Sequence, residues 1–267
     1  MKNNSLPLLA CPTCHGPLTV HPADGDVIQS GVLNCPACPK DYPVEAGIPH
    51  FITPKELTGF NQRFSRLYDW FSLIYRLFSK VAFACIGVNE ETGRREITDR
   101  LDPHGGRVLE VSIGPGVNLP YLIGRPDVGE MFGLDISPGQ LRRCQEYVRR
   151  KSWNVDLFLA NGEQIPFQDG TFKGVLHVGG INFFNDKKAA IDEMIRVASP
   201  GARILIADET EKGALGYEKI LPGFKGSFKG KRTRVDPPFS LVPVEMQEKR
   251  IFEVWKGWFY CIEFRKP

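Results

Sequence analysis

The chain has 267 residues, and 34 Lys and Arg against 31 Asp and Glu give a formal charge of +3, too small to indicate a nucleic-acid-binding protein by itself. Its hydrophobic content of 42% and charged content of 24% are ordinary for a globular protein, and its length allows one α/β core with a small appendage. The first residues contain no apolar stretch long enough for a signal peptide, which predicts a cytoplasmic protein.

Seven cysteines divide into two pairs near the N-terminus and three single residues, an odd count that favours a reduced compartment with one metal site over a disulfide framework. The pairs are two Cys-x-x-Cys motifs with twenty residues between them. This spacing predicts a structural Zn²⁺, one per chain, held by Cys11, Cys14, Cys35 and Cys38. Two disulfides, or a redox pair, are the alternatives.

The residues around these motifs resemble the small zinc-ribbon proteins that activate tRNA, rRNA and translation-factor methyltransferases. The resemblance covers residues 6–51, including the Tyr-Pro-Val and Gly-Ile-Pro segments that follow the second pair. In that family the ribbon docks on a methyltransferase by strand addition and performs no chemistry. The resemblance therefore implies a zinc-ribbon domain over residues 1–53, fused here to its methyltransferase, and it leaves open a further protein partner for the ribbon.

Residues 54–104 are predicted to form a linker and an amphipathic helical lid. Apolar side chains recur there at steps of three and four residues: Phe64, Leu67, Tyr68, Phe71, Ile74, Tyr75, Phe78 and Ala82. Arg76 and Lys80 interrupt the run, so no segment reaches the ~20 apolar residues of a membrane span. Three interpretations of this apolar face are open: it packs on the core, it covers the active site as a lid, or it contacts lipid or an apolar substrate. A second, solvated helix is predicted over residues 89–104, ending at Asp102-Pro103.

Residues 107–121 form an apolar run that ends in two glycines and continues into a helical pattern, which predicts a buried parallel strand and a turn open to a nucleotide-like ligand. Gly114 and Gly116 suit that turn because glycine lacks Cβ and lets ligand atoms approach the backbone. A turn used only for packing is the alternative. A second strand over residues 130–137 places Asp135 where it can accept both hydroxyls of a ribose.

The rest of the chain alternates strands and helices. Two strands are predicted within residues 157–178, a helix over 187–198, a turn at 199–201 and a fifth strand over 202–208. This alternation predicts an α/β fold with a doubly wound parallel sheet whose ligands lie at the carboxyl ends of the strands. Two alternating strands joined by Lys256-Gly257 then predict an antiparallel pair at the C-terminal end.

Residues 107–209 resemble a class I S-adenosylmethionine-dependent methyltransferase of the small-molecule type. The matching segments, in order, are Val-Leu-Glu-Val-Ser-Ile-Gly-Pro-Gly for the glycine motif, Gly-Leu-Asp-Ile-Ser for the ribose acid, Ala-Asn-Gly-Glu-Gln-Ile-Pro-Phe for the adenine turn, and Ser-Pro-Gly-Ala-Arg-Ile-Leu-Ile-Ala-Asp for the turn into the fifth strand. The resemblance implies a seven-stranded Rossmann-like methyltransferase sheet with an antiparallel C-terminal pair over residues 105–267. It also implies S-adenosyl-L-methionine as the cofactor.

Carried over position by position, the resemblance implies a set of cofactor-binding residues. They are Glu110 for the ammonium, Gly114 and Gly116 for the methionine moiety, Asp135 for the ribose, Ile136 for the adenine face, and Asn161, Gly162 and Glu163 for the adenine turn. Ser112 stands where glycine is usual and adds a hydroxyl near the carboxylate of the cofactor. Asn161 replaces the usual acid, so it accepts from the adenine amino group without charge assistance. His177 corresponds to a position that lines the methionine part of the pocket, and a structural histidine is the alternative.

The sequence identifies no catalytic acid or base, because a sulfonium is already an activated methyl donor and the protein mainly has to align the acceptor and exclude water. The adenine turn and the fifth-strand turn are those of the quinone and metabolite branch, so a small-molecule or lipid-like acceptor is the leading hypothesis. Residues 219–234, a basic loop with aromatic side chains, also suit RNA, lipid head groups or an acidic metabolite. An RNA methyltransferase is the second interpretation, and a non-catalytic S-adenosylmethionine-binding module, suggested by Ser112 and Asn161, is the third.

Overall fold

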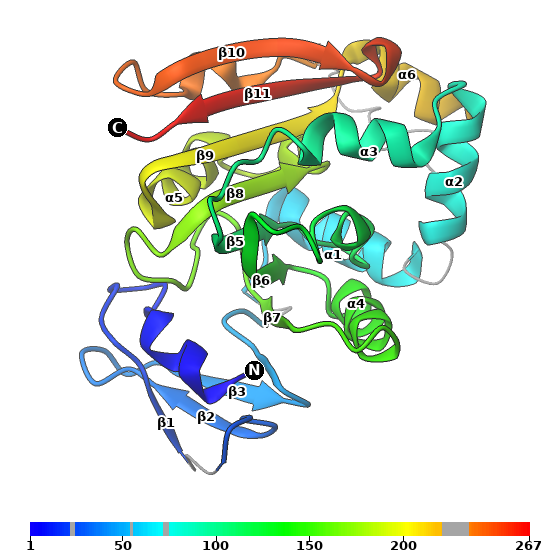
Figure 1. Cartoon of the computed structure of the whole chain (residues 1–267). Helices are drawn as coiled ribbons and strands as arrows, with labels where there is room; N and C mark the ends of the chain where they lie inside the picture. The colour runs from blue at the N-terminus through cyan, green and yellow to red at the C-terminus, as the bar shows by residue number, and fades with distance from the viewer. Residues whose placement is uncertain (22–24, 54–55, 72–74, 221–234) are drawn as a thin grey trace.

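The computed structural model describes residues 1–21, 25–53, 56–71, 75–220 and 235–267, and it contains two β-sheets (Figure 1). The larger sheet has seven strands in the order β10-β11-β9-β8-β5-β6-β7. These strands are β5 (Gly106–Val111), β6 (Val128–Asp135), β7 (Val155–Leu159), β8 (Phe172–Val178), β9 (Ala198–Glu209), β10 (Gln247–Val254) and β11 (Phe259–Arg265). Strands β5 to β9 are parallel, and β11 runs antiparallel to both of its neighbours. The predicted doubly wound sheet with an antiparallel C-terminal pair is confirmed.

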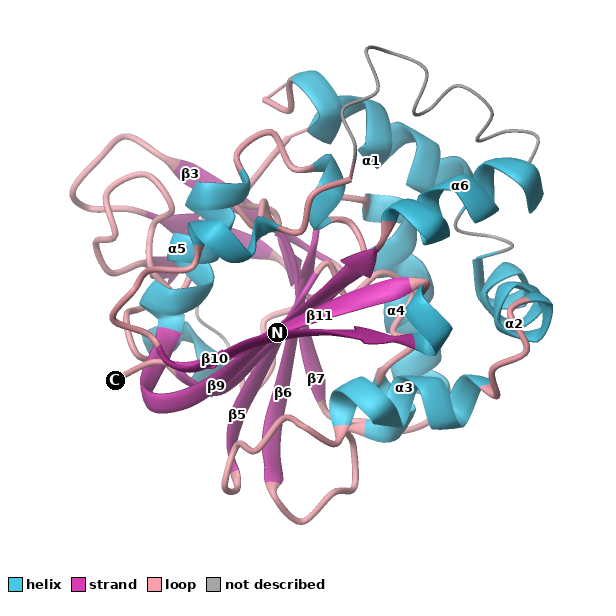
Figure 2. Ribbon diagram, turned by 90° about the horizontal axis from the view of Figure 1, so that it is seen from above, coloured by secondary structure: helices cyan, strands magenta, loops and turns pink. Residues whose placement is uncertain are grey.

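Helices cover both faces of this sheet, which explains why its central strands are buried along most of their length. The helices are α1 (Gly59–Phe71), α2 (Tyr75–Cys85), α3 (Glu90–Thr98), α4 (Pro138–Arg150), α5 (Lys187–Val197) and α6 (Glu211–Ile220). Short 3₁₀ turns are η1 (Asn3–Leu8), η2 (Leu119–Tyr121), η3 (Ile181–Phe183), η5 (Pro238–Leu241) and η6 (Trp255–Gly257). Side chains of α3 and α4 pack on one face, and α5 packs on the other together with the N-terminal sheet. Figure 2 shows α1, α2 and α6 gathered where the parallel strands end.

Three predicted elements differ from the structure. The run over residues 64–82 lies in two helices, α1 and α2, and Ile74 lies outside the described residues. Helix α3 ends at Thr98 instead of Asp102, because the Arg125 guanidinium donates to the carbonyls of Thr98 and Leu101 and satisfies the end of the helix there. Residues 199–201 are part of β9, where the register with β8 shifts, so the predicted turn is an irregularity inside a strand.

The smaller sheet is the predicted zinc ribbon, with the antiparallel order β1-β2-β3-β4. Its strands are β1 (Thr19–His21), β2 (Gly31–Asn34), β3 (Asp41–Glu45) and β4 (Ile48–Pro49). Directly after β4, His50 forms a parallel bridge with Leu159 of β7, and the Phe51 amide donates to the Leu159 carbonyl at 2.8 Å. The ribbon therefore docks on the edge of the large sheet by strand addition, within one chain.

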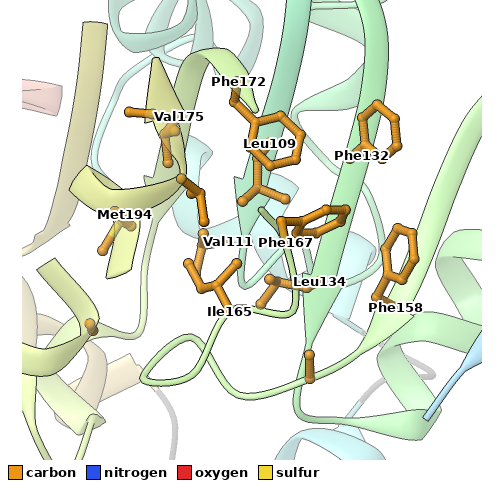
Figure 3. Close-up of a cluster of buried hydrophobic side chains, with 14 of the residues drawn as sticks. Leu109, Val111, Phe132, Leu134, Phe158, Ile165, Phe167, Phe172, Val175 and Met194 are labelled. Carbon is orange, nitrogen blue, oxygen red and sulfur yellow. The ribbon is translucent and has the colours of Figure 1, made fainter. Parts of the chain in front are cut away.

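The ribbon also closes one face of the large sheet. A cluster of buried aromatic rings, including Phe132, Phe158 and Phe167, lies against that face (Figure 3). Leu9 of the ribbon belongs to the same cluster and pairs with Phe167 through an antiparallel bridge. The ribbon and the large sheet therefore share one hydrophobic core.

Candidate active site

The predicted cofactor residues lie at the carboxyl ends of four adjacent strands, β5, β6, β7 and β8, as a doubly wound sheet requires. The glycine loop follows β5, and a Cβ placed on Gly114 would meet no atom within 4 Å. The same holds for Gly179, just after β8. Gly116 is different, because its Cβ would lie 2.8 Å from Leu119 and 2.9 Å from Cys144. Gly114 and Gly179 thus leave space for a ligand, whereas Gly116 lets the loop pack on α4.

Asp135 ends β6 with its carboxylate held in place by backbone donors. Its Oδ2 accepts from the Gly114 amide at 2.8 Å, and its Oδ1 accepts from the Ser137 amide at 2.9 Å. Burial raises the pKa of Asp135 to about 6, against the opposing effect of these two amides, and the nearby Asp69 raises it further. A carboxylate in this position is oriented to accept hydrogen bonds from ligand hydroxyls.

Glu110 lies on β5, below the glycine loop, and is 1% exposed. Its Oε1 accepts from the Asn118 amide nitrogen at 2.6 Å, while its Oε2 has no hydrogen-bond partner among the described residues. Burial raises the pKa of Glu110 to about 8, although the Asn118 hydrogen bond and the charge of Arg94 both act to lower it. The free oxygen suits a cationic ligand group, which would pair a carboxylate that is otherwise costly to bury.

Ser112 has a φ of 60°, in the left-handed region that favours glycine. The backbone of this loop therefore keeps the conformation expected of the glycine motif, although the side chain differs. Serine at this angle costs about 1 kcal/mol relative to glycine.

The turn after β7 brings Asn161, Gly162 and Glu163 beside the glycine loop. The Asn161 side-chain oxygen accepts from the Glu163 amide at 3.0 Å, so it stabilises the turn with one of its two lone pairs. A Cβ on Gly162 would lie 2.9 Å from Val111 and 3.0 Å from Phe184, so only glycine fits this contact. Ile136, half-buried, follows Asp135 directly at the same edge.

His177, near the end of β8, is fully buried. Its Nδ1 lies 3.0 Å from the Val111 carbonyl, so we assign Nδ1 as the donor and Nε2 as the acceptor. Burial lowers the pKa of His177, which keeps the ring neutral. Nε2 has no partner among the described residues, so this histidine carries a free acceptor.

Helix α1 lies over this edge of the sheet and is bonded to loops at that edge. The Asn61 amide donates to Glu163 at 2.9 Å, and the Ser65 hydroxyl donates to the Ile136 carbonyl at 3.0 Å. Asp69 accepts from the Ser137 hydroxyl at 2.6 Å. These contacts favour the interpretation of α1 as a lid. Within the described part of the chain, no helix is long and apolar enough to cross a bilayer.

The four paired cysteines also come together, with their sulfur atoms all within 4.8 Å of one another. The shorter distances are 3.5 Å between Cys11 and Cys38 and 3.4 Å between Cys14 and Cys35. Four thiolates bound tetrahedrally at about 2.3 Å from Zn²⁺ lie slightly under 4 Å apart, so the cluster fits zinc. The Tyr42 hydroxyl lies 3.2 Å from the Cys11 sulfur, where it can donate to a bound thiolate.

Comparisons with known proteins are consistent with the fold and the candidate sites described above. Residues 108–201 match the family described as a methyltransferase domain, and residues 5–47 match the Trm112p-like proteins. A demethylmenaquinone methyltransferase of Thermus thermophilus is 27% identical over 175 residues, covering 62% of this chain and 77% of that protein. A phosphatidylethanolamine N-methyltransferase of Cereibacter sphaeroides is 28% identical over 189 residues, covering 67% and 88%.

A solved structure of phosphoethanolamine N-methyltransferase 2 of Haemonchus contortus, in complex with S-adenosyl-L-methionine, has the same fold. Its TM-score is 0.57 at 14% identity, over 82% of this chain and 62% of that one. The chain described here is therefore a methyltransferase. More particularly, it is a methyltransferase domain with a Trm112p-like zinc ribbon joined to its N-terminal side in one polypeptide.

Sequence reasoning missed three residues that the structure places around the site: Asp69, Arg94 and Asn118. Asn118 directly follows the glycine loop, and this position in the sequence was the one available signal of a role at the site. Arg94 lies in a helix predicted to be solvated, yet it is 5% exposed. The basic loop proposed for substrate binding lies almost entirely in residues 221–234, outside the described residues.

Proposed function

We propose that this chain uses S-adenosyl-L-methionine and transfers its methyl group, by in-line displacement, to a small-molecule acceptor of the quinone or lipid class. The observation that carries the cofactor assignment is the presence of two buried carboxyls at a glycine loop that is open at Gly114: Glu110 precedes the loop on β5, and Asp135 accepts from the Gly114 amide. A dinucleotide would use the ribose acid, but it offers no ammonium for the free oxygen of Glu110.

Each predicted residue has a role in this proposal. Asp135 accepts from the ribose hydroxyls, and Ile136 packs on the adenine. Glu110 accepts from the ammonium, and the backbone of Gly114 lies against the methionine part. The bound cofactor supplies a methyl group already activated on a sulfonium, so the residues of the chain have to bind, orient and exclude water.

The remaining residues shape the pocket. Gly116 holds the loop on α4, and the Ser112 hydroxyl lies near the cofactor carboxylate. The turn of Asn161, Gly162 and Glu163 encloses the adenine. The neutral His177 lines the methionine side with its free acceptor, and it is a binding residue in this proposal, not a general base.

The acceptor class rests on relatives whose names give a quinone and a phospholipid as substrates. Helix α1 is suited to exclude water, because it is bonded to Glu163, Ile136 and Ser137 at the edge of the sheet where the cofactor is proposed to bind. The zinc is structural in this proposal, since four thiolates complete its shell and leave no position for substrate. We also propose the division of the chain into a ribbon over residues 1–53, a lid segment over 54–104 and a catalytic domain over 105–267.

The test has two parts. Calorimetry with S-adenosyl-L-methionine and with NAD identifies the cofactor, and binding of NAD alone would overturn the assignment. Methyl-labelled cofactor is then incubated with the enzyme and either a lipid extract or an RNA extract, with the Gly114→Arg variant as the blank. Label in the organic phase is expected. Label in RNA alone would overturn the acceptor class, and binding without any transfer would favour the non-catalytic interpretation.

A further inference from the structure

A chain of buried polar side chains links helices α2 and α3 to strand β5 behind the glycine loop. At its centre, the Arg94 guanidinium donates through all three nitrogens. Nη2 bonds the Ser79 hydroxyl at 2.6 Å, Nε bonds Glu90 at 3.1 Å, and Nη1 bonds the side-chain oxygen of Asn118 at 2.7 Å. Asn118 then donates to Glu110 at 2.6 Å. Arg94 and Asn118 are 5% and 3% exposed, so water does not compete for these bonds.

This chain fixes the orientation of the Asn118 amide. A guanidinium only donates, so the atom of Asn118 that faces Arg94 must be the oxygen. The amide nitrogen is therefore turned toward Glu110, where it can only donate. The outcome is that one oxygen of Glu110 is occupied and the other, Oε2, is buried with no partner among the described residues.

A buried carboxyl oxygen without a partner is uncommon in folded proteins and calls for an explanation, such as a bound ligand, ion or water. We infer that Arg94 is a positioning residue: acting through Asn118, it orients Glu110 so that Oε2 receives the ammonium of the cofactor. Arg94 has this role only if the cofactor of the proposed function is the ligand. The preceding helices then contribute to the binding site without touching the ligand.

Arg94 also has contacts that serve stability alone. Its guanidinium lies over the Phe83 ring at 5.2 Å, and its bonds to Ser79 and Glu90 tie α2 to α3. A loss of cofactor binding in an Arg94 variant is therefore insufficient evidence, because partial unfolding gives the same result. The experiment has to separate an effect through Glu110 from a general loss of structure.

A double-mutant cycle makes that separation. The affinity for S-adenosyl-L-methionine is measured by calorimetry for the full chain and for Arg94→Gln, Glu110→Gln and the double variant. Each single variant is expected to bind about tenfold more weakly or worse, the effect of losing one hydrogen bond to a charged group. If Arg94 acts through Glu110, the double variant binds about as weakly as Glu110→Gln alone. Additive losses would overturn the inference.

Two further variants distinguish a specific loss of cofactor binding from misfolding. Asn118→Leu keeps the approximate volume but removes both the acceptor that faces Arg94 and the donor to Glu110, so the KM for the cofactor should rise about tenfold with little change in kcat. An unchanged KM in a folded Asn118→Leu protein would overturn the role of the chain of bonds. Arg95→Gln, an exposed neighbour on the same helix, is the matched control and should bind normally. If the unmodified protein does not bind the cofactor at all, the proposed function fails instead.

Discussion

Cofactor binding should become tighter as the pH rises toward 8, because Glu110 has to lose a proton to pair with an ammonium. Burial raises the pKa of this carboxyl to about 8 in the unloaded protein. A group with that pKa is ~3% ionised at about pH 6.5 and ~24% ionised at about pH 7.5. The amino group of the ligand, with a pKa of ~7.7–8.0, reduces the gain slightly. The association constant should therefore rise about sixfold over this interval and level off near pH 8.

Other charged groups near Glu110 affect this profile in known directions. Arg94 on α3 lowers the pKa of Glu110, and Asp135 on β6 raises it. Asp135 itself, with a pKa of about 6, adds a smaller rise at the acid end because its carboxylate accepts from the ribose. Most of the rise between pH 6.5 and 7.5 thus belongs to Glu110.

Calorimetry in two buffers of different ionisation enthalpy measures both the affinity and the protons released. Near pH 7 we expect close to one proton released for each cofactor bound, within about 0.3 of a proton. The Glu110→Gln variant should bind weakly and release almost none, whereas Glu91→Gln, exposed on α3, should behave like the parent protein. A pH-independent affinity, or the same proton release in Glu110→Gln, would refute the reasoning.

The same carboxyl has the opposite effect on folding. Its pKa is raised from 4.5 when unfolded to about 8 when folded, so folding takes up a proton between these values. The stability of the unloaded protein should therefore fall as the pH rises from about 4.5 to about 8, by at most ~5 kcal/mol from this group. Thermal melts of the parent protein and Glu110→Gln should diverge in this range.

Three further predictions concern the loop and the ribbon. Gly114→Arg should abolish cofactor binding in calorimetry while metal analysis still finds zinc, because the added side chain fills the open space beside the loop; retained binding would mean that the pocket lies elsewhere. Ser112→Gly should stabilise the protein by ~1 kcal/mol in denaturant unfolding, since it relieves a positive φ, and no gain would mean that the hydroxyl makes up for the strain. Cys11→Ser should lower the zinc content from about one per chain to near zero, whereas Cys85→Ser, exposed on α2, should keep it. Equal zinc in both variants would contradict the assigned ligands.

The features of the candidate site that follow most directly from the sequence are those defined by short local patterns. The two cysteine pairs fix the metal ligands because four thiolates at that spacing have few other uses. The glycine loop and Asp135 follow from the strand-turn-helix pattern of a parallel sheet, whose carboxyl ends meet at one edge. Even Ser112, which breaks the pattern, keeps the left-handed backbone, with a φ of 60°.

The parts that sequence could not predict depend on contacts between distant segments. Arg94 is surrounded by polar residues in sequence, and only the packing of α3 on α2 and η2 buries it. The end of α3 is set by Arg125, 27 residues after Thr98. The proposed role of α1 as a lid depends on Asp69 meeting the N-terminus of α4, which a periodic pattern cannot reveal.

The ribbon contacts the methyltransferase domain on both sides of the turn formed by Asn161, Gly162 and Glu163, the proposed adenine turn, which gives a physical reason for their fusion. On one side Phe51 bonds the Leu159 carbonyl at 2.8 Å, and on the other Ala10 bonds the Pro166 carbonyl at 3.1 Å. Ala10 directly precedes the zinc ligand Cys11. Ordering of the chain around Cys11 by zinc therefore also orders Ala10, whose amide bonds the Pro166 carbonyl. A separate ribbon would have to bind this edge from solution, whereas a tethered one has an effective concentration of about millimolar. Fusion thus keeps this turn in place without dependence on the concentration of a second protein.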